Sequence, residues 1–148
     1  MSATPANLAT RKIPAPRVLP ETSAYWAAAN TGQLLVKKCV DCGEFHHYPR
    51  DICPHCLSAN TVWQPAAGTG TVYSFSTMGK GEAAYTLAFV TLDEGVTMMT
   101  NLVDCDISAV QINQRVRVVF KPAIRGSGGP GGSGGSGASQ AVPMFTPV

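Results

Sequence analysis

Four cysteines in two closely spaced pairs are the residues of this chain best suited to chemistry. The first pair is Cys39-Val-Asp-Cys42, and the second, separated from it by ten residues, is Cys53-Pro-His-Cys56. A CxxC pair can fold as a tight turn, or knuckle, whose backbone N–H groups point at the sulfur atoms, and Gly43 tolerates the positive φ that such a turn needs. Two facing knuckles make a tetrahedral thiolate cage, which suits Zn²⁺ at a Zn–S distance of about 2.3 Å. The spacing therefore predicts a metal site at these four cysteines.

Disulfides, haem attachment and redox catalysis are the alternatives to a metal site. No apolar leader opens the sequence and Cys105 would be left unpaired, so disulfides are disfavoured. A c-type haem needs His directly after a CxxC pair, where Gly43 and Leu57 stand instead. A thioredoxin-like redox site uses one CxxC pair at the start of a helix, not two facing pairs.

A closed shell of four thiolates has no open position for water, so its role is to fold the segment around it. His46, His47 and His55 are expected to be bystanders, or hydrogen-bond donors to the ligands. The formal net charge of +2 falls to zero when four thiols lose their protons and one Zn²⁺ binds. This near-neutral balance argues against a general binder of polyanions.

The rest of the chain is long enough for one compact body and a small module, with 148 residues of which 45% are hydrophobic. The sequence contains no run of eighteen apolar residues that would predict a membrane span, and we expect a cytoplasmic location. The proline-rich residues 1–20 predict an extended arm, either disordered or laid across a partner. Residues 21–32 predict a short helix with Tyr25 and Trp26 on one face, packed on the body or docked on a partner subunit.

The remaining elements are predicted to be short strands. Three of them surround the cysteines and make a zinc ribbon over 33–66. Residues 67–125 alternate with period two and predict four strands of a small antiparallel barrel. A five-stranded OB-type barrel fits if the apolar tail 141–148 crosses the Gly/Ser-rich linker 126–140 and supplies the fifth strand. The tail could instead enter a partner's groove.

No sequence motif indicates that this chain is an enzyme on its own. Walker, dinucleotide-binding and GxSxG motifs are absent, and Cys105 is expected to be an inert thiol. A ribbon joined to an OB-type barrel could bind single-stranded nucleic acid through a basic groove with stacking aromatics. The residues for that alternative are Tyr73, Phe75, Tyr85, Lys80, Arg115 and Arg117. The same groove could receive a phosphate-bearing cofactor or a partner protein, which the near-neutral charge favours.

The order of these motifs resembles the rubredoxin-type zinc-ribbon plus OB-fold family, long labelled domain of unknown function thirty-five. The matching motifs are the Tyr-Trp helix, Cys39-x2-Cys42-Gly43, Tyr48-Pro49-Arg50, Cys53-Pro54-x-Cys56, Gly68-x-Gly70-x-Val72-Tyr73-Ser74 and Pro143-Met144-Phe145. The resemblance covers nearly the whole chain apart from the arm and the Gly/Ser insert, and that insert departs from the family's usual short connection.

The resemblance implies a non-catalytic small subunit of a thiolase-like protein, in a complex that acts on acyl-CoA in lipid, steroid or aromatic degradation. The partner would hold the reactive residues of a thiolase, an acyltransferase or a retro-aldolase, and this chain would stabilise it and help frame the acyl-CoA site. Cys39, Cys42, Cys53 and Cys56 correspond to the family's structural zinc ligands. No CoA-contacting residue corresponds in the same way, and Lys80 and Arg115 are candidates from their charge alone.

Overall fold

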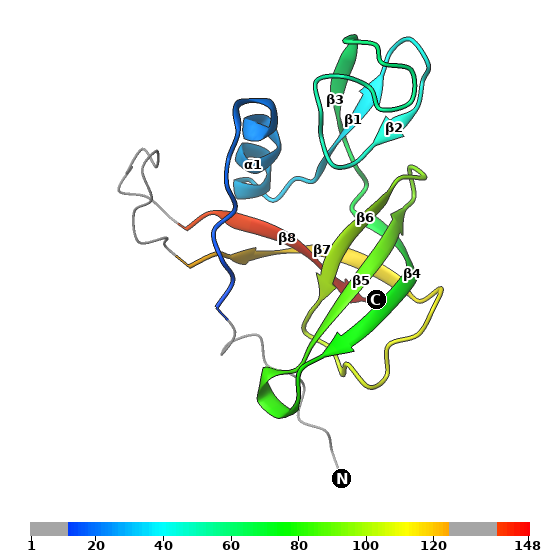
Figure 1. Ribbon diagram of the computed structural model, residues 1–148. Helices are drawn as coiled ribbons and strands as arrows, with labels where there is room; N and C mark the ends of the chain where they lie inside the picture. Colours follow the sequence, from blue (N-terminus) through cyan, green and yellow to red (C-terminus); the bar gives the residue numbers. More distant parts are fainter. Residues whose placement is uncertain (1–11, 125–138) are drawn as a thin grey trace.

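The described part of the chain forms a short helix, a three-stranded sheet and a closed five-stranded barrel (Figure 1). This computed structural model describes residues 12–124 and 139–148. The predicted class, mainly β with an N-terminal helix, a zinc ribbon and an OB-type barrel, is confirmed. No helix in the described part of the chain is long and apolar enough to cross a membrane.

The helical segment begins with a 3₁₀ turn, η2 (Pro20–Thr22), and continues as α1 (Ser23–Asn30). Eight residues make a helix that is marginal in isolation, so packing must hold it in place. Tyr25 and Trp26 are buried in the main hydrophobic core, and the aromatic face therefore packs on the body of this chain. Before the helix, the carbonyl of Ile13 accepts the N–H of Ile124 at 2.8 Å, so this part of the predicted arm lies against the barrel.

The cysteine-bearing segment forms a small antiparallel sheet. Its strands are β1 (Leu35–Cys39), β2 (Phe45–His46) and β3 (Thr61–Pro65), in the order β2-β1-β3. Strand β1 carries Cys39 at its end and pairs with both neighbours. The sheet thus fixes the first knuckle at the end of its central strand.

The barrel has the strand order β4-β5-β6-β8-β7. Its strands are β4 (Thr69–Met78), β5 (Tyr85–Leu92), β6 (Thr97–Leu102), β7 (Arg115–Pro122) and β8 (Ala141–Pro147), with a 3₁₀ turn, η3 (Gly81–Ala83), between β4 and β5. All neighbouring strands are antiparallel except β6 and β8. The tail supplies the fifth strand, as predicted, and residues 126–138 of the predicted linker lie outside the described residues.

Inward-facing apolar side chains fill the barrel. The fully buried ones include Val72, Val90, Val116 and Phe145. The backbone of β5 approaches β4 closely at Gly70, because a Cβ built there would be 2.4 Å from the carbonyl oxygen of Thr91. Only glycine permits this approach, which brings the two strands together at the barrel wall.

Candidate metal centre and adjoining pocket

The two CxxC segments fold as matching knuckles. In the first, the N–H of Gly43 donates to the carbonyl of Cys39 at 3.0 Å; in the second, the N–H of Leu57 donates to the carbonyl of Cys53 at 2.9 Å. Gly43 and Leu57 hold equivalent positions with φ of 77° and 65°. The second knuckle thus adopts the left-handed conformation with a leucine, which is strained relative to glycine.

The knuckles face each other and bring four sulfur atoms together. Cys39 and Cys56 have their Sγ atoms 3.6 Å apart, and Cys42 and Cys53 have theirs 3.7 Å apart. All four sulfurs lie within 4.8 Å of one another. A tetrahedron of thiolates at a Zn–S distance of about 2.3 Å has S···S separations of about 3.8 Å, so the spacing fits Zn²⁺. A disulfide, with sulfurs at about 2.0 Å, does not fit it.

Backbone N–H groups favour the thiolate form inside the knuckles. A hydrogen bond from the backbone of Cys42 is the largest cause that lowers the pKa of Cys39 to about 7. The N–H of His55 donates to Sγ of Cys53 at 3.4 Å. Asp41 joins the two knuckles, because its carboxylate accepts hydrogen bonds from Ser58 and from Asn60.

A buried lysine of β1 is held by an aromatic ring and a carboxylate. Lys37 places Nζ 4.5 Å from the centre of the Trp63 ring and 3.6 Å from the carboxylate of Asp51. Its side chain is 7% exposed, so these partners hold the ammonium group close to the sheet.

The three histidines do not belong to the sulfur cluster. Nε2 of His46 lies 3.2 Å from the carbonyl of Arg50, and Nε2 of His55 lies 3.3 Å from the carbonyl of Phe45. The ring of His46 therefore contacts the loop after β2, and the ring of His55 contacts β2 itself. His47 instead faces a pocket, where burial lowers its pKa to about 4 and keeps its ring neutral at physiological pH.

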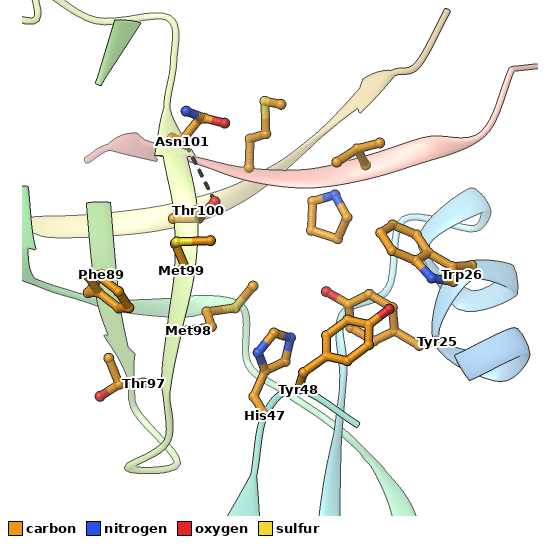
Figure 2. A pocket seen from close by; sticks show the side chains of 13 residues that line it. Tyr25, Trp26, His47, Tyr48, Phe89, Thr97, Met98, Met99, Thr100 and Asn101 are labelled. Carbon is orange, nitrogen blue, oxygen red and sulfur yellow. Dashed lines mark hydrogen bonds between the residues drawn. The ribbon is translucent and has the colours of Figure 1, made fainter. Parts of the chain in front are cut away.

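That pocket, called the aromatic pocket below, has a volume of about 540 Å³ and lies where the helix, the ribbon and the barrel meet (Figure 2). Its aromatic side comes from Tyr25 and Trp26 of α1 and from His47 and Tyr48 of the ribbon loop. Its barrel side consists of residues 97–101 of β6 and 142–144 of β8. Phe89 of β5 also lies on the barrel side, paired with Met99 of β6. None of these residues is charged, so the pocket suits an uncharged occupant.

The aromatic side chains of the pocket support one another. The ring of Tyr25 lies 4.9 Å from that of Trp26, 5.8 Å from that of His47 and 6.1 Å from that of Tyr48. Burial raises the pKa of Tyr25 above its usual range, so its hydroxyl stays protonated. Figure 2 shows the rings of Tyr25, Tyr48 and His47 gathered on the side of the pocket opposite Met99.

The two candidate CoA-contacting residues do not lie together. Arg115 faces Thr71 near one end of β4, while Lys80 follows Met78 at the other end. Seven residues of strand separate those ends by about 23 Å. Arg115 also forms a two-pronged ion pair with Asp93 at 2.8 and 3.1 Å, which lowers the pKa of Asp93 to about 2. A role for Lys80 and Arg115 in CoA binding stays a prediction.

The aromatic residues considered for nucleic-acid stacking are divided by a β-bulge. The register between β4 and β5 shifts between Val72 and Ser74, so the simple alternation expected along β4 is interrupted at Tyr73. Tyr73 is 69% exposed, whereas Phe75 packs against the core. The bulge therefore breaks up the stacking surface that the alternation implied.

The aromatic pocket was not predicted from the sequence. Its residues come from five separate elements, and His47, Tyr48, the Tyr-Trp pair and the terminal Pro143-Met144-Phe145 motif stood out in the chain for other reasons. The helix pair and the terminal motif line the same pocket as His47 and Tyr48, through Tyr25, Trp26, Pro143 and Met144. The shared location of these residues would have indicated the pocket, but that location depends on pairing between segments far apart in the sequence.

Comparison with known proteins identifies the family. The model for the rubredoxin-like zinc ribbon domain of ChsH2 matches residues 26–62, and that for the C-terminal OB-fold domain of ChsH2 matches residues 63–121. A DUF35 domain-containing scaffold protein of Methanothermobacter thermautotrophicus is 32% identical over 95 residues, which cover 60% of this chain and 71% of that protein. The chain belongs to the DUF35 family. A second DUF35 scaffold protein, from Methanocaldococcus jannaschii, is 30% identical over 95 residues, 60% of this chain and 67% of that protein.

One further relative is much longer than this DUF35 chain. It is a probable enoyl-CoA hydratase alpha subunit of Thermomonospora curvata, 30% identical over 128 residues. The match covers 75% of this DUF35 chain but only 40% of that relative. The DUF35 unit is thus one part of that larger subunit.

Solved structures share the architecture of this DUF35 protein. A chain of the Ltp2-ChsH2(DUF35) aldolase superposes with a TM-score of 0.71 at 28% identity and covers 89% of this chain and 98% of that one. A DUF35 protein of unknown function from Sulfolobus solfataricus superposes with a TM-score of 0.55 at 13% identity, covering 68% and 78% of the two chains, which shows a common fold.

Proposed function

We propose that this chain is a non-catalytic, zinc-binding subunit of a thiolase-like complex that acts on acyl-CoA. The observation that carries the proposal is its match to nearly the whole of one chain in the Ltp2-ChsH2(DUF35) aldolase, at a TM-score of 0.71. That name describes an enzyme assembled with a DUF35 chain. The hydratase alpha subunit that contains a similar unit also supports a setting among acyl-CoA enzymes.

The zinc in this proposal is structural. Cys39, Cys42, Cys53 and Cys56 would hold one Zn²⁺, and their sulfur spacing and knuckle hydrogen bonds support that assignment. Four thiolates close the coordination shell, so the metal would supply folding stability and no Lewis-acid site. The ion would keep the ribbon loop in place, and with it His47 and Tyr48 at the aromatic pocket.

The chain's own residues would act on the reaction through position and shape. The ribbon and α1 would anchor the chain to the partner, and the barrel would cover the acyl-CoA entrance and exclude water. The uncharged lining of the aromatic pocket supports a contact from which water is excluded. The partner would supply the groups that make or break the carbon–carbon bond, and the expected cytoplasmic location stays a prediction.

The deciding experiment is co-expression with a thiolase-like protein from the same organism. We expect the two proteins to co-purify at a fixed ratio, and the partner's acyl-CoA activity to fall when this chain is omitted. Independent elution of the two proteins, together with activity indifferent to this chain, would contradict the proposal. Turnover of an acyl-CoA by this chain alone would contradict its non-catalytic role.

A further inference from the structure

Strands β6 and β8 pair at one position and then separate around the aromatic pocket. Among the described residues their register holds only Leu102 opposite Phe145, and the N–H of Val103 donates to the carbonyl of Phe145 at 2.8 Å. By contrast, β6 pairs with β5 at six positions and β8 pairs with β7 at seven. Residues 97–101 and 142–144 line the pocket from its two sides, so the pocket opens where this ladder stops.

Proline explains where the ladder stops. In a parallel ladder, alternate residues of a strand direct their N–H and C=O groups toward the same neighbouring strand. Since Phe145 pairs with β6, Pro143 is the preceding residue of β8 whose backbone faces β6. Pro143 has no N–H to donate, and the acceptor it would meet in the ladder is the carbonyl of Met99. Two residues further back, the N–H of Ala141 donates to Oδ1 of Asn30 at 2.8 Å, so α1 takes over this edge of β8.

The backbone of β6 is left with an open edge toward the pocket. The N–H of Leu92 donates to the carbonyl of Val96 at 2.8 Å in the β5–β6 hairpin. In an antiparallel ladder, alternate residues bond to the same neighbour, so the even-numbered residues of β6 bond to β5. The N–H and C=O groups of Thr97 and Met99 therefore point away from β5. No strand within 12–124 or 139–148 pairs with these two residues on that side. Their N–H and C=O groups repeat every 6–7 Å or so, as on any strand edge.

The side chains around this edge favour an apolar polypeptide. Native edge strands are commonly protected by lysine or proline, and β6 contains neither. Met99 is 58% exposed and lies directly opposite Phe89, which is 44% exposed. Tyr48 continues this exposed apolar surface on the ribbon side. The surface offers backbone hydrogen bonds and apolar contact but no charge.

We propose that an extended, uncharged segment of the partner subunit adds to β6 as an extra strand within the aromatic pocket. The inference rests on the proposed function and names the contact through which the partner is held. The segment's backbone would bond to Thr97 and Met99, where Pro143 prevents β8 from doing so. Its side chains would contact Met99 and Phe89 on one face and the tyrosine rings on the other, as strand addition pairs backbone bonding with side-chain pockets.

A strand fits this edge better than the other occupants. A helix satisfies its N–H and C=O groups internally and would leave those of Thr97 and Met99 without partners. The barrel has a second open edge, because β4 pairs with β7 only as far as Thr71 among the described residues. That edge includes the exposed Thr77 and lies outside the aromatic pocket, so it provides a matched control.

The test compares proline at the two edges of the full chain, with the co-expressed thiolase-like subunit as the probe. Met99→Pro removes an outward N–H at the pocket, and Thr77→Pro removes an equivalent N–H on β4. We expect Met99→Pro to weaken the affinity for the partner about tenfold or more, since one hydrogen bond and the fit of the added strand are lost. Thr77→Pro should bind like the unaltered chain. Zinc content and circular dichroism verify that each variant folds.

Amide hydrogen exchange measures the same contact in the unaltered chain. In the free chain we expect the amide of Met99 to exchange rapidly and that of Met98 slowly, and in the complex both should be protected.

Pro143→Val restores a donor on β8 and should protect the region around Met99 through the chain's own ladder, with weaker partner binding.

The outcome that contradicts the proposed function differs from the outcomes that contradict this inference alone. If the unaltered chain and the partner never co-purify, the proposed function fails and this inference fails with it. If they co-purify and a folded Met99→Pro variant binds with full affinity, this inference is wrong while the proposed function stands. Loss of binding in Thr77→Pro alone would assign the contact to β4. Dimers of the free chain that Met99→Pro abolishes would assign the edge to a second copy.

Discussion

Asn30 and Ala141 are joined across 111 residues of sequence, because Oδ1 of Asn30 accepts the N–H of Ala141 at 2.8 Å. The same Oδ1 accepts Nε2 of Gln140 at 3.0 Å, and that amide also donates to the carbonyl of Trp26 at 2.9 Å. The C-terminal end of α1 is therefore bonded to the beginning of β8. This link holds the helical side of the aromatic pocket against its barrel side.

Removing this link should destabilise the protein. Asn30→Ala deletes the acceptor for Ala141 and the contacts with Gln140, so we expect the free energy of unfolding to fall by about 1 to 2 kcal/mol. Gln33→Ala, at an exposed position just after the helix, is the control and should change stability little. Urea unfolding followed by tryptophan fluorescence measures both, and equal stability of the two variants would argue against the link.

Metal content should depend on the knuckle cysteines and not on the fifth cysteine. Elemental analysis of the unaltered protein is expected to give one zinc per chain. Cys39→Ser should lose most of the zinc and much of the soluble protein, because a structural site contributes directly to folding. Cys105→Ser should keep the metal, since Cys105 lies outside the sulfur cluster. Stoichiometric zinc in Cys39→Ser would contradict the assignment.

Chelation should disorder the ribbon before the barrel. The ribbon strands have two to five residues in an open sheet, whereas the barrel strands have six to ten residues in a closed ladder. We expect a strong chelator to abolish hydrogen-exchange protection in β1–β3 while β5 and β7 stay protected. The ring of Tyr48 should also become mobile, because its loop belongs to the ribbon. Simultaneous loss of protection in both parts would show a single cooperative unit.

Acid should weaken the fold through His47. Burial lowers the pKa of His47 from its ordinary 6.5 to about 4, so the unfolded chain binds a proton at a pH where the folded chain does not. Stability should therefore fall as the pH drops from 6.5 to about 4, by up to about 3 kcal/mol from this group. Below about pH 4 both states are protonated and the loss should level off.

The contribution of His47 can be separated from that of the metal site. Unfolding of the unaltered chain and of His47→Gln is compared across this pH range, so that acid release of zinc affects both. The variant should show a shallower dependence on pH. His55→Gln, on the exposed side of the ribbon, should keep the full dependence, and parallel curves for all three proteins would contradict the role of His47.

Close packing of β4 on β5 should make Gly70 intolerant of a side chain. Gly70→Ala places a methyl group against the backbone of Thr91, which can move little, so we expect a loss of about 1 to 3 kcal/mol. Ser76→Ala, an exposed position in the same strand, is the control. Thermal unfolding of both variants measures the difference, and a neutral Gly70→Ala would show that the strands can separate without cost.

The sequence was most informative where structure depends on near neighbours. Each knuckle is formed within six residues, so spacing was enough to predict that Cys39, Cys42, Cys53 and Cys56 converge. The alternating pattern likewise predicted the barrel strands. The alternation is interrupted at Tyr73, where a bulge shifts the register by one residue, and the sequence pattern does not reveal this bulge.

The aromatic pocket depends on relationships that the sequence does not display. It requires β8 to insert between β6 and β7, to run parallel to β6, and to stop pairing at Pro143. The proline was visible in the tail, but its neighbour Met99 could be identified only once Leu102 was known to face Phe145. Long-range pairing of this kind sets which backbone groups remain open.

The insertion of β8 between β6 and β7 also constrains how the chain can fold during synthesis. When β4 to β7 have left the ribosome, the barrel still lacks one wall, and the cavity that Phe145 fills stands open to water. The nascent barrel must wait for Ala141–Pro147 before its interior is sealed. In a cell, that interval is when chaperones, or an early-arriving companion protein, would have the most to shield.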